Sequence, residues 1–314
     1  MFACAACRAW PLRRDGDALA CPACGATAHV VDDVAVFVET DTFYDEYAEE
    51  HAQFHPNPGG NKERVLRWLP FWSWREWRFL RSSIPPDGVL VELGCGRGRE
   101  LFATREGTTI GIEGAMAAAR DCVAAYDAVA LAHLPGIPLP DASADVVVSA
   151  HVIGHLGTDD KDELFSEIHR VLRPGGRTVH IIETDSEHPA VVAAKAKPDA
   201  YRDRFVDQHG HIGLEPTAVV LDRLERAGFH VTRTDLVEAV VLSAQNLHTF
   251  FNHPDLQDLP ETRKARRFAT AASRGGATNI AYEIAMGAFH RTVEQWAGKP
   301  ERSQFVHVVA DRER

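Results

Sequence analysis

Val89-Leu-Val-Glu-Leu-Gly-Cys-Gly-Arg-Gly98 is the stretch of sequence that decides the fold. Its apolar run 89–93 predicts a short buried strand that carries one acid, Glu92. Alternating glycines follow, and glycine lets a backbone turn sharply and lets a ligand approach the main chain closely. A dinucleotide fingerprint needs its third glycine at position 99, which is arginine. The pattern is instead E-x-G-x-G-x-G, with a nucleotide-binding turn of another kind as the alternative.

Strands and helices alternate after this turn. An apolar run that ends at Ser149 predicts a second strongly buried strand. The alternation predicts an α/β fold, a doubly wound and mainly parallel sheet of seven strands. The other strands are expected at 109–113, 129–132, 177–183, 229–236 and 304–310, and the helices at 99–105, 115–125, 161–172 and 217–227.

Changes in composition divide the chain into three parts. Residues 1–40 are rich in Cys, Ala and Val and predict short strands and turns. Residues 41–85 have a helical pattern and are interpreted as a cap or linker, which ends at the helix-breaking sequence PPDG. Residues 86–314 are expected to form the main domain, with a helical insertion near 240–300 that suits a substrate pocket or a homodimer contact.

Four cysteines near the start have the spacing of a metal site. Cys4-x-x-Cys7 is followed after thirteen residues by Cys21-x-x-Cys24. Each CxxC forms a tight turn that points two thiolates at one ion, and two such turns supply the four ligands of a closed, structural zinc site. A redox pair or unrelated cysteines are the alternatives.

The glycine turn resembles the first motif of class I S-adenosylmethionine-dependent methyltransferases, of the methyltransferase type 11-like group. The resemblance implies that Gly94, Cys95 and Gly96 seat the methionine and ribose parts of the cofactor. It also implies that the carboxylate of Glu92 attracts the cationic end of the cofactor.

Further matches follow in register. Glu113, beside Gly114, ends the second strand and is placed to bind both ribose hydroxyls. The stretches 139–156 and 171–181 resemble the approach to strand four, whose last residue Ser149 is expected at the cofactor, and the turn into strand five, where Pro-Gly-Gly stops a helix.

The chain departs from this family pattern after the third strand. An aspartate usually binds the adenine amine there, but this chain reads ALAHL at 130–134. Backbone groups near Ala132 and His133 are expected to serve the adenine instead. A second departure is Ala144, which replaces the usual phenylalanine before strand four.

The cysteine-rich segment resembles the short zinc ribbon of Trm112-like type that precedes some bacterial methyltransferases. A similar prefix in ribosomal-RNA guanine methyltransferases helps to hold RNA. Residues 1–40 here contain three arginines against five acids, and four thiolates would add negative charge. This balance argues against RNA as the partner of the ribbon.

Two segments before the glycine turn are candidates for the substrate side. Residues 42–51 resemble the FYD-x-x-A helix that folds over the cofactor in small-molecule methyltransferases, which makes Tyr47 a candidate pocket residue. Residues 64–81 hold five Arg and four Trp, a composition found in nucleic-acid or membrane contacts. We favour inward packing of these rings with solvated arginines.

Methyl transfer needs alignment of the nucleophile with the methyl group, and an oxygen or carbon nucleophile also needs a base. His151 and His155 follow strand four, at the carboxyl edge where such sheets bind ligands, and they are the candidate catalytic residues. His209 and His211 lie on a later turn.

The net charge of −11 lowers the expectation of nucleic-acid binding, and no run of residues is long enough to span a membrane. The sequence therefore predicts a cytoplasmic methyltransferase that uses S-adenosylmethionine and zinc and acts on O, N or C of a small molecule. The alternatives are an RNA-base methyltransferase that uses the ribbon, a non-methylating protein of the same fold, and an enzyme that uses the cofactor only electrostatically.

Overall fold

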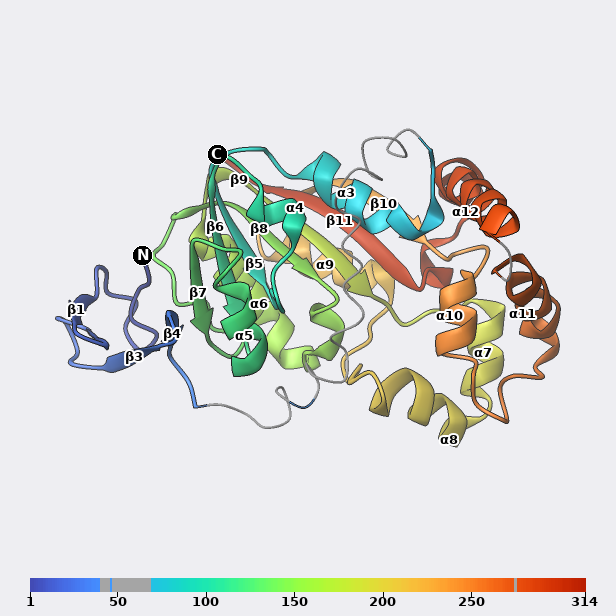
Figure 1. The fold of residues 1–314 in the computed structure, drawn as a ribbon, viewed down its shortest axis with the longest axis horizontal. Helices are drawn as coiled ribbons and strands as arrows, with labels where there is room; N and C mark the ends of the chain where they lie inside the picture. Colours follow the sequence, from blue (N-terminus) through green and yellow to red (C-terminus); the bar gives the residue numbers. More distant parts are fainter. Residues whose placement is uncertain (40–45, 47–68, 274–275) are drawn as a thin grey trace.

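A computed structural model describes residues 1–39, 46, 69–273 and 276–314, and its centre is one continuous β-sheet (Figure 1). Within these residues the strand order is β1-β2-β3-β4-β7-β6-β5-β8-β9-β11-β10. The strands are β1 (Arg13–Asp15), β2 (Ala18–Ala20), β3 (Thr27–Val31), β4 (Val34–Val36), β5 (Val89–Leu93), β6 (Thr108–Glu113), β7 (Ala128–Leu131), β8 (Ala144–Ala150), β9 (Leu172–Glu183), β10 (Phe229–Val237) and β11 (Phe305–Arg312).

Helices and single helical turns (η) connect these strands. They are η2 (Trp72–Trp74), α3 (Arg75–Ser83), α4 (Glu100–Ala103), α5 (Met116–Cys122), η3 (Ile153–His155), α6 (Thr158–Val171), α7 (Pro189–Lys195), α8 (Pro198–Tyr201), η4 (Arg202–Asp207), α9 (Thr217–Arg226), α10 (Ala244–Thr249), α11 (Pro260–Ser273), α12 (Gly276–Phe289), η5 (His290–Glu294), α13 (Gln295–Ala297) and η6 (Pro300–Arg302). Apart from residue 46, the expected helix at 42–51, with Tyr47, lies outside the described residues.

The seven strands β7-β6-β5-β8-β9-β11-β10 confirm the expected α/β sheet. The five neighbouring strands β7, β6, β5, β8 and β9 run parallel to one another, and β11 is antiparallel to both of its neighbours. The ribbon strands continue the same sheet, because Val34 and Val36 of β4 pair in parallel with Val129 and Leu131 of β7. The sequence analysis did not anticipate that the ribbon extends the main sheet.

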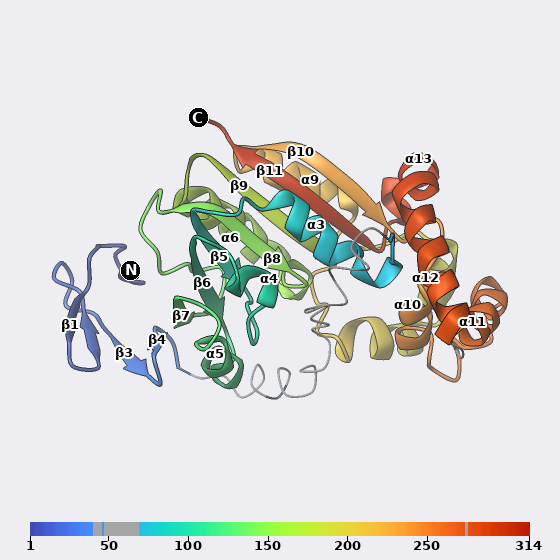
Figure 2. The same ribbon diagram turned by 45° about the horizontal axis from the view of Figure 1, so that its top comes forward.

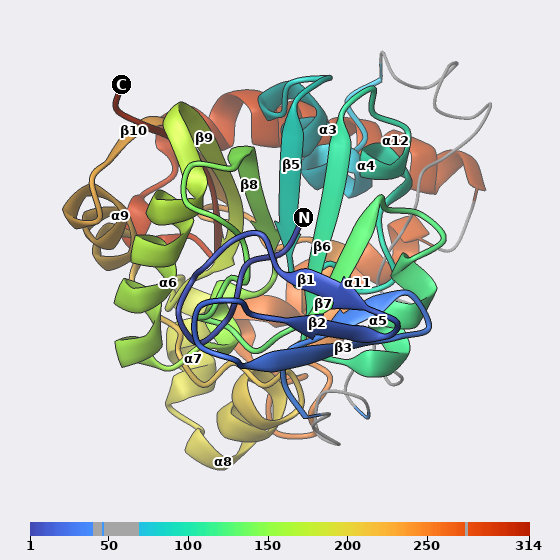
Figure 3. The same cartoon turned by 90° about the vertical axis from the view of Figure 1, so that its left-hand side faces the viewer.

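Helices cover both faces of the sheet, and each face has its own apolar core. On one face Val91 and Leu93 of β5 pack with Phe165 of α6 and Leu224 of α9. On the other face Leu90 of β5 packs with apolar residues of α3, α4 and α5. Figures 2 and 3 show these helices on opposite sides of the sheet. Because both faces are buried, β5 is apolar throughout except for Glu92.

The strand β9 begins earlier than expected. Its pairing with β8 starts at Leu172, shifts register, and resumes at Arg177. Gly175 has a φ of +80°, so the Pro-Gly-Gly sequence forms an irregularity inside the strand. The helix α6 does end directly before it, at Val171.

A helical part stands at the end of the molecule away from the ribbon (Figure 1). It contains α7, α8, α10, α11 and α12, and its apolar core includes Phe205, Phe250 and Phe251. Among the described residues, no helix is long and apolar enough to cross a membrane.

Candidate cofactor and acceptor site

The glycine turn sits at the carboxyl end of β5. The amides of Gly94 and Cys95 donate to the carbonyl of Ile112 in β6, at 2.8 and 3.2 Å. Gly94 has a φ of +62°, and a Cβ there would lie 2.5 Å from a methyl carbon of Val152. The turn therefore requires glycine, and it packs directly against the segment that follows β8.

Glu113 holds the turn in place from the end of β6. Its carboxylate accepts hydrogen bonds from the amides of Gly96 at 2.7 Å, Gly114 at 2.9 Å and Ala115 at 3.0 Å. These bonds join the turn after β5 to the start of α5. Three residues expected at the cofactor, Gly96, Glu113 and Gly114, thus meet at one corner of the sheet edge.

Glu92 lies beneath this corner and is fully buried. Arg99 donates to its Oε1 at 2.6 Å, and the hydroxyl of Tyr126 donates to its other oxygen. Burial raises the pKa of Glu92, and the guanidinium of Arg99 opposes that rise. Both oxygens are thus engaged within the protein, so Glu92 supports the turn, and its expected attraction for the cofactor stays a prediction.

The other residues expected at the cofactor contribute main-chain groups to the edge. The Ala132 amide donates to the Glu113 carbonyl at 2.9 Å, and the His133 carbonyl accepts from Gly136 at 3.1 Å. Side chains of Cys95 and Ser149 are buried.

Each of these two side chains points away from the edge. A Cβ on Gly111 of β6 would lie 2.6 Å from the Cys95 sulfur, so that thiol points into the sheet. The Ser149 hydroxyl lies 2.7 Å from Nδ1 of His180. Burial lowers the pKa of His180 to about 3, so this imidazole is neutral at pH 7.

His151 follows β8 and is held between two carboxylates. Its Nδ1 lies 2.5 Å from Oε1 of Glu183, and its Nε2 lies 3.1 Å from Oε2 of Glu76. Burial acts to lower the pKa of His151, but the two carboxylates outweigh burial and raise that pKa to about 10. The imidazole is therefore protonated at pH 7.

His155 lies one turn further along, in η3. Its Nδ1 donates to the carbonyl of Gly210 at 3.2 Å, and its ring centroid is 5.0 Å from that of His211. His209 stacks on His211, with centroids 5.7 Å apart. The structure thus brings together the histidines after β8 and the histidines of the later turn, which the sequence placed on separate segments.

A small pocket opens beside the His151–Glu183 pair, with a cavity volume of about 20 Å³. Two of its lining residues, Glu183 and Gln304, each have a buried polar atom, Oε2 and Nε2, without a hydrogen-bond partner in the described part of the chain. Sequence reasoning missed both residues. The lining residues are Glu183, Thr184, Ser186, Val191, Tyr201, Phe205, His211, Leu214, Phe250, Gln304 and Phe305.

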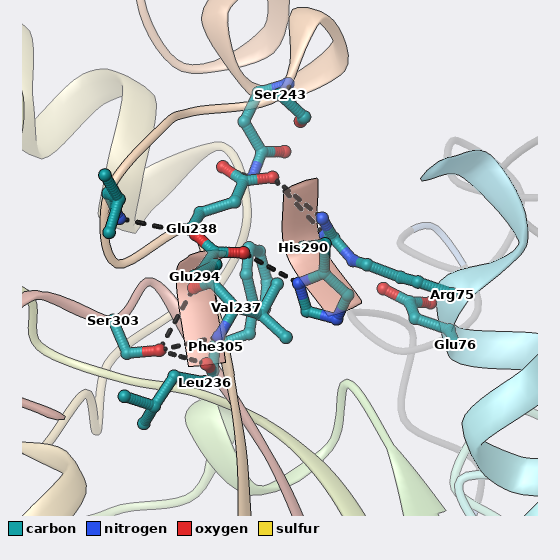
Figure 4. Close-up of polar contacts among 12 residues, drawn as sticks. Arg75, Glu76, Leu236, Val237, Glu238, Ser243, His290, Glu294, Ser303 and Phe305 are labelled. Carbon is teal, nitrogen blue, oxygen red and sulfur yellow. Dashed lines mark hydrogen bonds and ion pairs between the residues drawn. The ribbon is translucent and has the colours of Figure 1, made fainter. Parts of the chain in front are cut away.

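A buried polar cluster fixes the start of α3, which carries Glu76 (Figure 4). Both terminal nitrogens of Arg75 lie 3.3 Å from Oε1 of Glu238, which is fully buried. Nearby, Nδ1 of His290 lies 2.7 Å from a carboxylate oxygen of Glu294. Because Arg75 is held in this way, its neighbour Glu76 is positioned against His151.

The four cysteines of the ribbon converge on one point. The sulfur atoms of Cys4, Cys7, Cys21 and Cys24 all lie within 4.8 Å of one another. The pair Cys4–Cys24 is 3.6 Å apart and the pair Cys7–Cys21 is 3.5 Å apart. Tetrahedral zinc, with Zn–S bonds of about 2.3 Å, places its sulfurs about 3.8 Å apart. The cluster therefore has the residues and nearly the spacing of a structural zinc site.

The ribbon is attached to the main domain by more than the β4–β7 pairing. The Ala3 amide donates to the Pro138 carbonyl at 3.0 Å. Arg8, which has a φ of +63°, donates to Glu167 of α6 at 2.8 Å. These contacts make the ribbon an integral edge of the sheet.

Comparison with known proteins agrees with this geometry. Residues 91–180, from β5 to β9, match the family described as "Methyltransferase domain". This part of the chain is similar to a methyltransferase domain. A "Probable S-adenosylmethionine-dependent methyltransferase" of Mycolicibacterium smegmatis is 36% identical over 149 residues, which is 46% of this chain and 53% of that protein. The chain thus spans about half the length of this curated relative.

Two solved structures show the same fold at low identity. A methyltransferase of Thermotoga maritima has a TM-score of 0.50 at 16% identity, over 87% of this chain and 99% of that one. Phosphoethanolamine N-methyltransferase 2 of Haemonchus contortus has a TM-score of 0.50 at 13% identity, over 86% of this chain and 60% of that one.

Proposed function

We propose that the protein transfers a methyl group from S-adenosylmethionine to a small-molecule acceptor. One observation carries the proposal. The glycine turn after β5 packs against Val152, whose neighbour His151 contacts Glu183 at the edge of the acceptor pocket. The cofactor corner and the pocket are thus adjacent at the carboxyl edge of the sheet, where such folds bind ligands.

The corner around Glu113 suits the proposed cofactor. Glycines leave the main chain open to a ligand, and Glu113, the acid at the end of β6, is the residue that we propose to bind the ribose hydroxyls. Ala132 and His133, directly after β7, are the residues that we propose for the adenine end. When bound, S-adenosylmethionine supplies a methyl group on a sulfonium, which is already a good leaving group. The chain then has to align the acceptor and exclude water.

The histidines take different roles in this proposal. A protonated His151 has no lone pair with which to accept a proton, so we assign it the role of positioning Glu183 and Glu76. His155 stays the candidate base for an acceptor that needs one. Because its Nδ1–H donates to the Gly210 carbonyl, the neutral ring carries its lone pair on Nε2.

The ribbon is proposed to bind one zinc ion through Cys4, Cys7, Cys21 and Cys24. Four thiolates close the coordination shell, so the metal stabilises the fold and takes no part in the transfer. The acidic balance of the ribbon and its attachment to β7 support a structural role, not a grip on RNA.

Isothermal titration calorimetry with S-adenosylmethionine tests the cofactor, and the absence of binding would overturn the proposal. A mass-spectrometric screen of small molecules with methyl-labelled S-adenosylmethionine then tests transfer. The expected result is a product that has gained one labelled methyl group, together with S-adenosylhomocysteine. Salt-dependent binding and methylation of RNA would support the RNA alternative.

A further inference from the structure

The pocket beside His151 contains a buried carboxylate oxygen without a partner. Glu183 lines the pocket and is 5% exposed, and its Oε1 contacts His151 while its Oε2 has no hydrogen-bond partner among the described residues. Gly154 gives this oxygen its space, because a Cβ there would lie 2.9 Å from it. An unpaired buried carboxylate oxygen is costly unless a ligand donates a hydrogen bond to it.

The charge around this oxygen is negative. Burial acts to raise the pKa of both carboxyl groups, but His151 outweighs burial, lowering the pKa of Glu183 to about 2 and that of Glu76 below its ordinary range, so both carboxylates are ionised. One protonated imidazole, His151, stands between them and leaves one net negative charge. Burial lowers the pKa of His211 to about 4, so that lining residue adds no positive charge at pH 7.

Three cations near this charge are paired with other carboxylates, among them Lys161, which lies 3.2 Å from Glu215. Lys195 lies 2.5 Å from Asp185, and Arg75 is paired with Glu238. The pocket therefore favours a cation from outside the protein.

Aromatic rings form much of the remaining wall. Tyr201 stacks on Phe205 with centroids 4.7 Å apart, and Phe205 stacks on Phe250 at 4.9 Å. Phe305 lies edge-on to His151 at 5.7 Å. Aromatic faces attract cations, and the cavity of about 20 Å³ has room for one group the size of a water molecule.

We propose that this pocket binds a protonated amino group of the methyl acceptor, which donates a hydrogen bond to Oε2 of Glu183. The unpaired amide nitrogen of Gln304 is a donor, so in this pocket it can contact an acceptor atom of the bound molecule but not its ammonium group. An ammonium group has no lone pair, so the pocket anchors the acceptor and the methyl group goes to another of its atoms. The assignment of the anchored molecule as the acceptor rests on the proposed methyltransferase function.

The test compares a charged probe with its neutral isostere. Binding of 1-butylamine and 1-butanol at pH 7 is followed through the side-chain amide signal of Gln304 in ¹⁵N NMR spectra. We expect butylamine to bind at least tenfold more tightly than butanol. Equal affinities would overturn the proposal.

Variants test whether Glu183 causes the preference for butylamine over butanol. Glu183→Gln is expected to abolish the tenfold preference, whereas Glu187→Gln, the same change at an exposed site four residues later, is expected to keep it. Gly154→Ala keeps the carboxylate but crowds its free oxygen, so it should also weaken amine binding. A preference that survives in both Glu183→Gln and Gly154→Ala would contradict the assignment.

Two further readouts separate this inference from the proposed function. S-adenosylmethionine is proposed to bind at a different part of the sheet edge, which calorimetry tests separately. If the cofactor binds but the amine is not preferred over the alcohol, the amine-binding proposal is overturned and the proposed function is not. If the acceptor found by mass spectrometry carries an amine, we expect that amine to be unmethylated in the product. A methyl group on the anchored nitrogen would contradict the anchor.

Discussion

The imidazole Nδ1 of His151 lies 2.5 Å from Oε1 of Glu183 and joins the end of β8 to the end of β9. His151 has a φ of +61°, a left-handed conformation that costs about 1–2 kcal/mol for a residue with a side chain. Its second ring nitrogen reaches Glu76 on α3. Backbone strain of this kind is often found at functional sites. The three elements are thus tied together where the cofactor corner meets the pocket.

The first prediction concerns the titration of His151. Its pKa is raised to about 10, so pairing with Glu183 contributes stability that is fully present below about pH 6.5 and is lost as the pH rises through 10. The pKa of Glu183 is lowered to about 2, so the same pairing is also lost as the pH falls from about 4.5 toward 2. NMR titration of ¹⁵N-labelled histidine should show one imidazole that stays charged at pH 8.

The variant Glu183→Gln assigns the charged imidazole signal in the NMR titration to His151. The variant removes one of the two carboxylates, so the pKa of His151 should fall toward its ordinary value. The control Glu187→Gln, at an exposed position, should leave the signal unchanged. A His151 that titrates near 6.5 in the unchanged protein would contradict the ion-pair geometry.

The second prediction concerns Glu113 and the cofactor. Glu113→Gln replaces one carboxylate oxygen with an NH₂ group, which cannot accept from the amides of Gly96, Gly114 or Ala115. The turn loses an anchor and the ribose loses a charged acceptor. We expect S-adenosylmethionine to bind at least tenfold more weakly by calorimetry, which is about 1.4 kcal/mol.

Glu106→Gln is the matched control for this experiment, because Glu106 is an exposed acid that precedes β6. Its affinity for the cofactor should equal that of the unchanged protein. Unaltered affinity in Glu113→Gln would exclude this corner as the ribose site.

The sequence predicted the sheet well, because its strands are short apolar runs whose burial shows in composition alone. Elements β5, β6, β8 and β9 end close to their expected positions. The pairing of β4 with β7 left no such signal, because two short apolar strands from distant segments carry no mark of their partnership. The cysteine quartet was predictable because its ligand spacing is local.

The pocket beside His151 was less predictable, because it is assembled from distant segments. Glu76, His151, Glu183 and Gln304 come from α3, the end of β8, the end of β9 and the start of β11. Glu183 did carry a signal, since it is an acid at the end of a buried strand, as Glu113 is. Tyr126 is distant from Glu92 in the sequence, so the sequence pattern did not reveal that the two side chains are hydrogen-bonded.

The third prediction concerns Gly94. Gly94→Ala places a methyl group 2.5 Å from a Val152 methyl carbon at a φ of +62°. Strain and overpacking together should cost on the order of 2–4 kcal/mol, and cofactor binding should be lost. Gly16→Ala is the control, because Gly16 has a similar φ of +58° with nothing within 4 Å of the new Cβ.

Gly16→Ala should cost only about 1–2 kcal/mol of left-handed strain and should keep full cofactor binding. Chemical denaturation measures the two free energies of unfolding, and calorimetry measures binding. Equal losses of stability in the two variants would show that contact with Val152 does not constrain the turn.

The last prediction links the metal to the sheet. We expect one zinc ion per chain by elemental analysis, held by the four cysteine sulfurs. Removal of zinc by a chelator should unfold the ribbon, because a segment of this size has little core of its own. Strand β4 would then leave β7, and hydrogen exchange should rise in β4 and at Val129 and Leu131, which pair with it. The strand β10, at the opposite edge, is the internal control and should keep its protection. Stoichiometric zinc whose removal leaves exchange in β4 and β7 unchanged would show that the ribbon holds its place in the sheet without the metal.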